Sequence, residues 1–220
     1  MKTVKENLLE IKENIAPYKP NIIAVTKYFD ETKLIEAYDA GLRNFAESRA
    51  NEAVEKINRL PEEVRNNSVF HFIGHLQSNK IKKVVGVFHY IHSIDSLKLA
   101  DAVSKEAISQ KVNQKILLQV NNANEEQKFG FSKEELFEVF PKIIALKNLQ
   151  VVGLMNMTPL NSQENTRLEL FKEIAQMKDE LNRVYGTCLK ELSMGMSLDY
   201  EEAVVAGATM IRVGRKLFST

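Results

Sequence analysis

The chain has 220 residues, of which 44% are hydrophobic and 27% charged, and its 30 Lys+Arg and 29 Asp+Glu leave a formal net charge of +1. This composition is typical of an ordinary soluble globular protein with a sizeable core. The near-zero net charge argues against a nucleic-acid or anionic-lipid partner. The single cysteine forms no internal disulfide, no stretch nears the roughly 18 apolar residues of a membrane span, and the N-terminus lacks an apolar signal segment. We therefore expect a cytoplasmic protein that binds no membrane.

An amphipathic helix is predicted at the N-terminus, because apolar residues recur there at helical spacing: Val4, Leu8, Ile11 and Ile15. Pro17 ends this pattern. The next segment, 21–26, is almost entirely apolar and predicts a short strand. A strand without polar alternation is typical of parallel sheets, whose strands are buried on both faces.

Helix and strand then alternate along the rest of the chain. Strands are predicted at 21–26, 43–46, 68–73, 89–92, 115–120, 149–154, 188–192 and 209–213. Helices between them are predicted at 32–40, 49–59, 79–85, 96–110, 132–146, 164–185 and 200–206. Because no linker or low-complexity segment divides the chain, residues 1–220 are expected to form a single domain.

The alternation predicts an α/β fold. Strands separated by helices form right-handed βαβ units and a parallel sheet. Eight such units fit a closed (β/α)8 TIM-type barrel, in which the N-terminal helix would cover the place of the helix missing after the last strand. A doubly wound open sheet is the competing architecture, but eight strands would make it wide.

Polar residues follow most of the predicted strands. In a barrel these residues meet at one mouth, where active sites lie. The segments are Thr26-Lys27, Glu47-Ser48-Arg49, Gly74-His75, His92-Ser93, Met155-Asn156, Ser193–Ser197 and Arg212–Arg215.

The loops after the seventh and eighth strands have the composition of a phosphate site. Ser193, Gly195 and Ser197 offer hydroxyls and unhindered backbone N–H groups, and Gly214 lets backbone approach closely from the other side. Barrels often bind phosphate with these two loops. The alternative to a phosphate site is a purely structural role, with a tight turn at Gly195 and a kink at Gly214. These residues alone leave both interpretations open.

Lys27 stands directly after a buried apolar strand. Desolvation and nearby cations can lower the pKa of a lysine and leave a nucleophilic amine suited to a Schiff base. The alternative is a surface lysine that extends its amine into water. A phosphate site opposite such a lysine points to a phosphorylated aldehyde, and pyridoxal 5′-phosphate satisfies both ends.

Three other features favour ordinary structural roles. His71 and His75 are four residues apart, but no acidic or cysteine partner completes a metal site, so none is predicted. The basic run at 80–83 is typical of a solvated face. Cys188, inside a predicted strand, is expected to be a small core residue.

Taken together, the motifs resemble the pyridoxal phosphate homeostasis protein family, the barrel-only relatives of alanine racemase. The matching segments run in family order over essentially the whole chain. They are Ala24–Lys27, Asn44–Ser48, Phe70–Lys80, Ile91–Asp95, Leu118–Asn121, Lys128–Gly130, Gly153–Met155, Leu192–Ser197 and Ile211–Gly214. The strings His-Phe-Ile-Gly-His-Leu-Gln and Leu-Ser-Met-Gly-Met-Ser are the most specific.

This resemblance implies a barrel like the alanine racemase N-terminal domain, with pyridoxal phosphate held as an internal aldimine on Lys27. It places Arg212 at the pyridine nitrogen of the cofactor. It also implies further cofactor contacts, with the phosphate held by Ser197, Gly214 and the backbone of Arg215, and with His75, Met155 and Ser193 around the ring or phosphate.

Two positions depart from the family pattern. The family commonly has Gly-Glu-Asn where this chain has Ala46-Glu47-Ser48, and that asparagine lies near the cofactor ring. Because Ser48 is shorter, a water can intervene between it and the ring. Arg215 stands where relatives commonly have Thr or Ser, so a backbone contact to phosphate survives but a hydroxyl contact does not.

The same resemblance favours a carrier over an enzyme, so no catalytic residue is assigned. An arginine at the pyridine nitrogen disfavours the protonated ring and weakens the electron sink of carbanion chemistry. Racemase relatives also supply a second base from a C-terminal domain, for which we expect no room after Thr220. We expect a monomer that buffers pyridoxal phosphate, with apo-enzymes that need this cofactor as candidate recipients.

Two other functions stay open on the sequence alone. The first is a minor pyridoxal phosphate-dependent amino-acid racemase that uses His75 or Tyr28 as a base. The second is a phosphosugar-type barrel enzyme without this cofactor.

Overall fold

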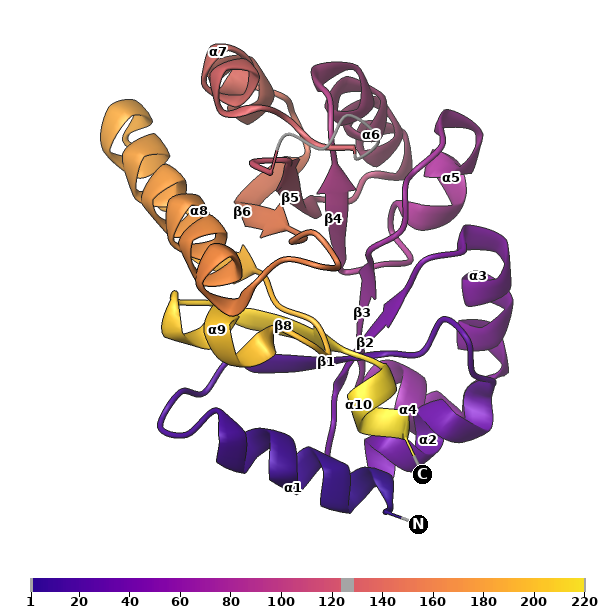
Figure 1. Ribbon diagram of the computed structural model, residues 1–220. Coiled ribbons are helices and arrows are strands. Elements are labelled where there is room, and N and C mark those ends of the chain that lie inside the picture. Colours follow the sequence, from indigo (N-terminus) through magenta and orange to yellow (C-terminus); the bar gives the residue numbers. More distant parts are fainter. Residues whose placement is uncertain (1, 124–128, 220) are drawn as a thin grey trace.

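The computed structural model describes residues 2–123 and 129–219, and its eight strands close into one barrel in chain order (Figure 1). Neighbouring strands are parallel, including β1 and β8, which close the ring. The strands are β1 (Asn21–Val25), β2 (Asn44–Glu47), β3 (Val69–Phe72), β4 (Tyr90–Ile94), β5 (Gln114–Val120), β6 (Leu149–Asn156), β7 (Glu191–Ser193) and β8 (Met210–Val213). The predicted (β/α)8 barrel is confirmed, and the open sheet is excluded.

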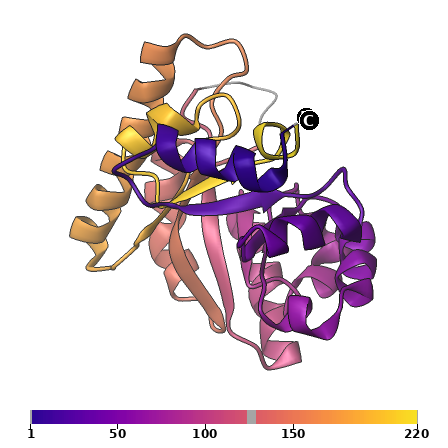
Figure 2. The same ribbon diagram turned by 90° about the horizontal axis from the view of Figure 1, so that it is seen from below.

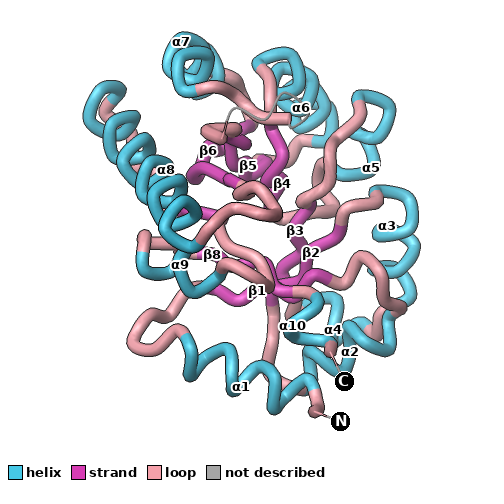
Figure 3. The backbone as a smooth tube through the Cα atoms, viewed as in Figure 1, coloured by secondary structure: helices cyan, strands magenta, loops and turns pink. Residues whose placement is uncertain are grey.

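Helices surround the strands on the outside of the barrel, as Figure 3 shows. They are α1 (Val4–Asn14), α2 (Glu31–Asp39), α3 (Ala50–Arg59), α4 (Glu62–Asn66), α5 (Ile81–Val84), α6 (Leu97–Gln110), α7 (Lys133–Ile144), α8 (Glu164–Tyr185), α9 (Tyr200–Val205) and α10 (Arg215–Phe218), with a 3-10 turn η1 (Ser78–Lys80) before α5. The sequence pattern does not predict α4 or α10, because each spans hardly more than one turn. Within the described ranges, no helix is long and apolar enough to cross a bilayer.

Strand β1 shows why the barrel strands are apolar at consecutive positions. Ile22 and Ala24 belong to the core between the barrel and its helices. Ile23, between them, packs inside the barrel with Ala46 and Met210. Successive side chains of a strand point to opposite faces, so a strand buried on both faces needs apolar residues at every position.

The strand predicted at 188–192 is largely wrong. Only Glu191–Ser193 forms β7, and Cys188 lies before it with an exposed side chain, so it is not a core residue. The side-chain amide of Asn182 accounts for the difference, because its oxygen accepts from Leu189 N at 2.7 Å and its nitrogen donates to Leu189 O at 3.1 Å. This segment therefore satisfies part of its backbone on α8 before it enters the sheet.

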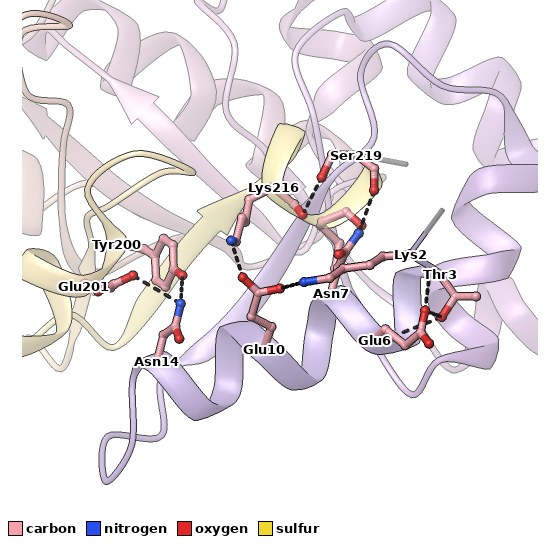
Figure 4. A network of polar contacts seen from close by, with 11 residues as sticks. Lys2, Thr3, Glu6, Asn7, Glu10, Asn14, Tyr200, Glu201, Lys216 and Ser219 are labelled. Carbon is pink, nitrogen blue, oxygen red and sulfur yellow. Dashed lines mark hydrogen bonds and ion pairs between the residues drawn. The ribbon is translucent and has the colours of Figure 1, made fainter.

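Helix α1 fills the gap in the helical ring beside the last strand, as expected. It packs against α2 and α10, and the two ends of the described chain lie side by side (Figures 1 and 2). Its side chains reach α10 directly (Figure 4). Asn7 Nδ2 donates to Leu217 O at 3.0 Å and to Ser219 O at 2.8 Å, and Glu10 pairs with Lys216 at 2.5 Å. These contacts join the first turns of the chain to the segment that follows β8.

Asn7 is 3% exposed, so removing its amide leaves two carbonyls at the end of α10 without their donor. We expect Asn7→Ala to lower the free energy of unfolding by about 1–3 kcal/mol. Asn14→Ala is the matched control, because Asn14 bonds Tyr200 Oη from an exposed position and its loss should cost less than about 1 kcal/mol. Urea denaturation measures both, and equal losses would show that Asn7 has no special role at this junction.

Candidate functional site

A cavity of about 780 Å³ opens at the ends of the strands where the sequence predicts a site. It is lined by residues that follow β1, β2, β6, β7 and β8. Seven of the predicted cofactor-binding residues line it: Lys27, Ser48, Met155, Ser197, Arg212, Gly214 and Arg215. Tyr28, the candidate base of the racemase alternative, also lines it, together with side chains to which the sequence analysis gave no role: Met157, Pro159, Leu160, Met196 and Leu198.

Lys27 projects from a strand end that is firmly anchored. The preceding residue, Thr26, is fully buried, and its Oγ1 donates to Glu47 Oε1 at 2.7 Å. Lys56 Nζ donates to the same carboxylate at 2.7 Å and to Thr26 O at 2.8 Å. This buried ion pair fixes the end of β1, while Lys27 itself lines the cavity with Nζ 5.0 Å from the centroid of the Tyr28 ring.

Arg212 places a buried cation at the floor of the cavity. It is 3% exposed, and its Nη1 donates to Ser193 O and Ser193 Oγ, both at 2.6 Å, while Nη2 donates to Asn156 O at 2.8 Å. In the described part of the chain no carboxylate lies within 4.0 Å of this guanidinium, and its Nε–H has no acceptor. Burial lowers the pKa of Arg212 to about 10, although the charge of Asp199 opposes that shift. The guanidinium therefore stays charged at neutral pH.

An unmatched buried cation is unfavourable unless dipoles or a ligand stabilise it. Carbonyl and hydroxyl oxygens supply part of that stabilisation here. Two N–H groups of Arg212, Nε–H and one on Nη2, are left without an acceptor in the described chain, and they favour a ligand whose electron-rich atom accepts a hydrogen bond. A pyridine nitrogen is such an acceptor, so the residues present fit a pyridine-bearing ligand.

The loop after β7 turns sharply at Gly195, whose φ is +84°. A Cβ at this position would lie 2.6 Å from Ala203 Cβ, so the loop packs too closely on α9 for any side chain. The buried Asp199 closes the turn, since its Oδ1 accepts from Met196 N at 2.6 Å and its Oδ2 from Thr158 Oγ1 at 2.5 Å.

The loops after β7 and β8 are joined by one hydrogen bond. Ser197 Oγ accepts from Lys216 N at 3.2 Å, and Lys216 is the residue that Glu10 of α1 holds. Gly214 approaches β1, where a Cβ would lie 3.3 Å from Val25 Cβ. The loops thus bring a serine hydroxyl and unhindered backbone to the cavity that Lys27 also lines, as an anionic group such as phosphate requires.

Two of the predicted residues lie elsewhere. Ser193 is fully buried beneath the cavity, where it contacts Arg212. His75 lies outside the cavity, stacked on Phe129 with centroids 3.8 Å apart and with Nδ1 3.4 Å from Asp95 Oδ2. It lines a separate hollow of about 240 Å³, which Ser48 also borders.

Sequence reasoning missed the polar interior of the barrel beneath Arg212. His71 and His92 lie there in contact with each other, not at a metal site. Over the described ranges no cluster of three or more His, Cys, Asp or Glu side chains is arranged to hold a metal ion. The signal was present, because Phe70 and Phe72 flank His71 and strand alternation then turns His71 toward the barrel interior.

The close approach at Gly195 can be separated from its left-handed backbone. Gly207 also has a positive φ, +97°, but a Cβ there meets nothing within 4 Å. We expect Gly207→Ala to lower the free energy of unfolding by about 1–2 kcal/mol for the backbone alone. Gly195→Ala should cost at least about 1 kcal/mol more, because its Cβ overlaps α9. Urea denaturation of both variants checks this, and equal losses would argue against the close packing.

The chain as a whole is similar to proteins of a known family. The family model described as the alanine racemase N-terminal domain matches residues 1–220. A protein of Synechocystis sp. named pyridoxal phosphate homeostasis protein is 44% identical over 210 residues, which cover 94% of each chain.

Solved structures agree with this assignment. PipY from Synechococcus elongatus, solved with pyridoxal phosphate bound, is 35% identical and superposes with a TM-score of 0.89 over 98% of this chain and 100% of that one. Diaminopimelate decarboxylase from Helicobacter pylori superposes with a TM-score of 0.76 over 97% of this chain and 61% of that one, at 17% identity. The decarboxylase shares the fold alone.

Proposed function

This chain belongs to the alanine racemase N-terminal domain family, together with the pyridoxal phosphate homeostasis proteins, and on that premise we propose that it binds pyridoxal 5′-phosphate to carry or buffer it. The bound-cofactor structure of PipY, a relative of matching length, supports this ligand. The cavity supports it independently, because an amine, an unmatched buried guanidinium and a pair of glycine- and serine-bearing loops face one space.

We assign a residue of the cavity to each polar group of the ligand. Lys27 forms a Schiff base with the aldehyde carbon, and the aldehyde oxygen leaves as water. Ser197, Gly214 and the backbone of Arg215 hold the phosphate, while Arg212 donates a hydrogen bond to the ring nitrogen. Met155 lines the same cavity. Ser193 supports Arg212 from below.

The buried Arg212 is the single observation that favours carriage over catalysis. The cofactor supplies an aldehyde and, when its ring is protonated, an electron sink. A guanidinium with a pKa of about 10 and no carboxylate beside it in the described chain donates to the ring nitrogen and does not protonate it. The ring then remains a weak electron sink, and robust turnover of amino acids is not expected.

The remaining parts of the proposal rest on the family. The protein acts as a cytoplasmic monomer, and it gives up its cofactor to apo-enzymes that need it. A covalent link that water reverses suits this task, because the aldehyde is kept from stray amines while it is held.

Borohydride reduction followed by peptide mapping tests the site. With pyridoxal phosphate added, the protein should show a visible absorption band, and reduction should leave a pyridoxyl group on the peptide that contains Lys27. Lys27→Ala should lose this adduct, whereas the control Lys80→Ala, in the neighbouring hollow, should keep it. An adduct spread over surface lysines, or one that survives in Lys27→Ala, would refute the assignment.

A racemase remains the second candidate because Tyr28 lines the cavity beside Lys27. If the protein is a carrier, amino acids incubated with it in deuterium oxide should gain no more α-deuterium than with free pyridoxal phosphate. Mass spectrometry measures this. Faster exchange that disappears in both Lys27→Ala and Tyr28→Phe would establish the enzyme instead.

A further inference from the structure

Two buried histidines in the barrel interior have no part in the function proposed above. His71 on β3 is 1% exposed and His92 on β4 is 0% exposed. His71 Nδ1 lies 2.9 Å from His92 Nε2, and Tyr90 stacks on the His71 ring with centroids 4.8 Å apart. Buried polar side chains that satisfy one another's hydrogen bonds fix a single arrangement of the groups around them.

The histidine pair is the middle of a longer chain of hydrogen bonds. At one end, His71 Nε2 lies 3.1 Å from Asn44 Oδ1 on β2. At the other end, His92 Nδ1 lies 2.9 Å from Ser193 Oγ on β7, and Arg212 Nη1 on β8 donates to that same oxygen. Five side chains thus link one side of the barrel to the floor of the cavity.

The donors and acceptors of this hydrogen-bond chain can be arranged in only one direction. An amide oxygen only accepts, so His71 Nε2 carries its hydrogen and His71 Nδ1 accepts from the Nε2–H of His92. His92 Nδ1 is then an acceptor, and the hydroxyl of Ser193 donates to it. The hydroxyl oxygen is left to accept from Arg212.

Both imidazoles are neutral in this arrangement, as burial requires. Burial lowers the pKa of His71 to about 3, and it lowers the pKa of His92 well below its ordinary value, with the nearby Arg212 charge acting in the same direction. The two ends of this hydrogen-bond chain are a guanidinium and an amide, neither of which changes its protonation state near neutral pH. The chain therefore positions groups and does not relay protons.

We propose that His92, supported by His71 and Asn44, is the positioning residue for Arg212. By accepting the hydroxyl hydrogen of Ser193, it turns the serine oxygen toward the guanidinium and so holds Arg212 at the cavity with two N–H groups left for a ligand. The part of this inference that concerns a ligand rests on the proposed function, in which one of these donors meets the ring nitrogen of pyridoxal phosphate.

Variants at His92 separate positioning from packing. His92→Gln keeps one acceptor and one donor, whereas His92→Leu keeps neither. Ile116→Val, at a fully buried position of β5, is the control, because it lowers the stability of the protein without changing any residue of the hydrogen-bond chain. His92→Leu should release bound pyridoxal phosphate about 2- to 10-fold faster and shift its visible absorption band. His92→Gln and Ile116→Val should keep the wild-type spectrum and release rate within about twofold.

Unchanged release and spectrum in a folded His92→Leu would overturn the positioning role. If His92→Leu does not fold, Ser193→Ala provides the same test, because it removes the hydroxyl between His92 and Arg212. The same faster release is expected from it, and wild-type release would equally overturn the inference.

The hydrogen-bond chain through the two histidines can be tested without any cofactor. The protein has four histidines, so ¹⁵N-histidine NMR with single-residue variants assigns each imidazole. At neutral pH, His71 and His92 should both be neutral with the hydrogen on Nε2. A charged imidazolium or an Nδ1–H form at either residue would overturn the inference. Failure of the wild type to bind pyridoxal phosphate would instead refute the proposed function. The NMR result would still show whether the hydrogen-bond chain has the predicted tautomers.

Discussion

Arg212 carries a positive charge in a position that water scarcely reaches, and oxygen dipoles, not a carboxylate, surround it in the described structure. A carboxylate partner would instead neutralise this charge within the protein. Dipoles satisfy it only in part, so the cation remains available to an acceptor in the cavity. Ser193 at the end of β7, Asn156 at the end of β6 and His92 in the barrel interior all take part in this arrangement.

The fold supplies the rigidity that such an arrangement needs. Lys56 and Glu47 form a buried ion pair that anchors the strand end before Lys27. At the candidate phosphate site, Ser197 accepts a hydrogen bond from Lys216, and Glu10 of α1 pairs with Lys216. The amine and the anion site are therefore held by separate supports.

The sequence predicted those features that follow from position along a strand. Lys27, Ser197 and Gly214 were expected at one mouth because parallel strands of a barrel end there, and they line one cavity. The closed barrel could also be predicted, because eight alternating strand–helix units fit a barrel better than a wide open sheet.

Features that depend on partners distant in sequence were not accessible. His92 meets Ser193 across 101 residues, and no local pattern says that β4 faces β7 through the barrel interior. His75, which is predicted to contact the cofactor, stacks on Phe129 and pairs with Asp95, and no local pattern indicates either partner. The predicted bounds of β7 were also wrong, because the side chain of Asn182 in α8 forms hydrogen bonds with the backbone of Leu189.

The role proposed for Arg212 is to keep the ring nitrogen of bound pyridoxal phosphate unprotonated. The most direct test is ¹⁵N NMR of the protein loaded with pyridoxal phosphate labelled at the ring nitrogen. We expect the signal of a neutral pyridine throughout the neutral pH range. The signal of a pyridinium at pH 7 would contradict it, because the cofactor would then have the electron sink of an active catalyst.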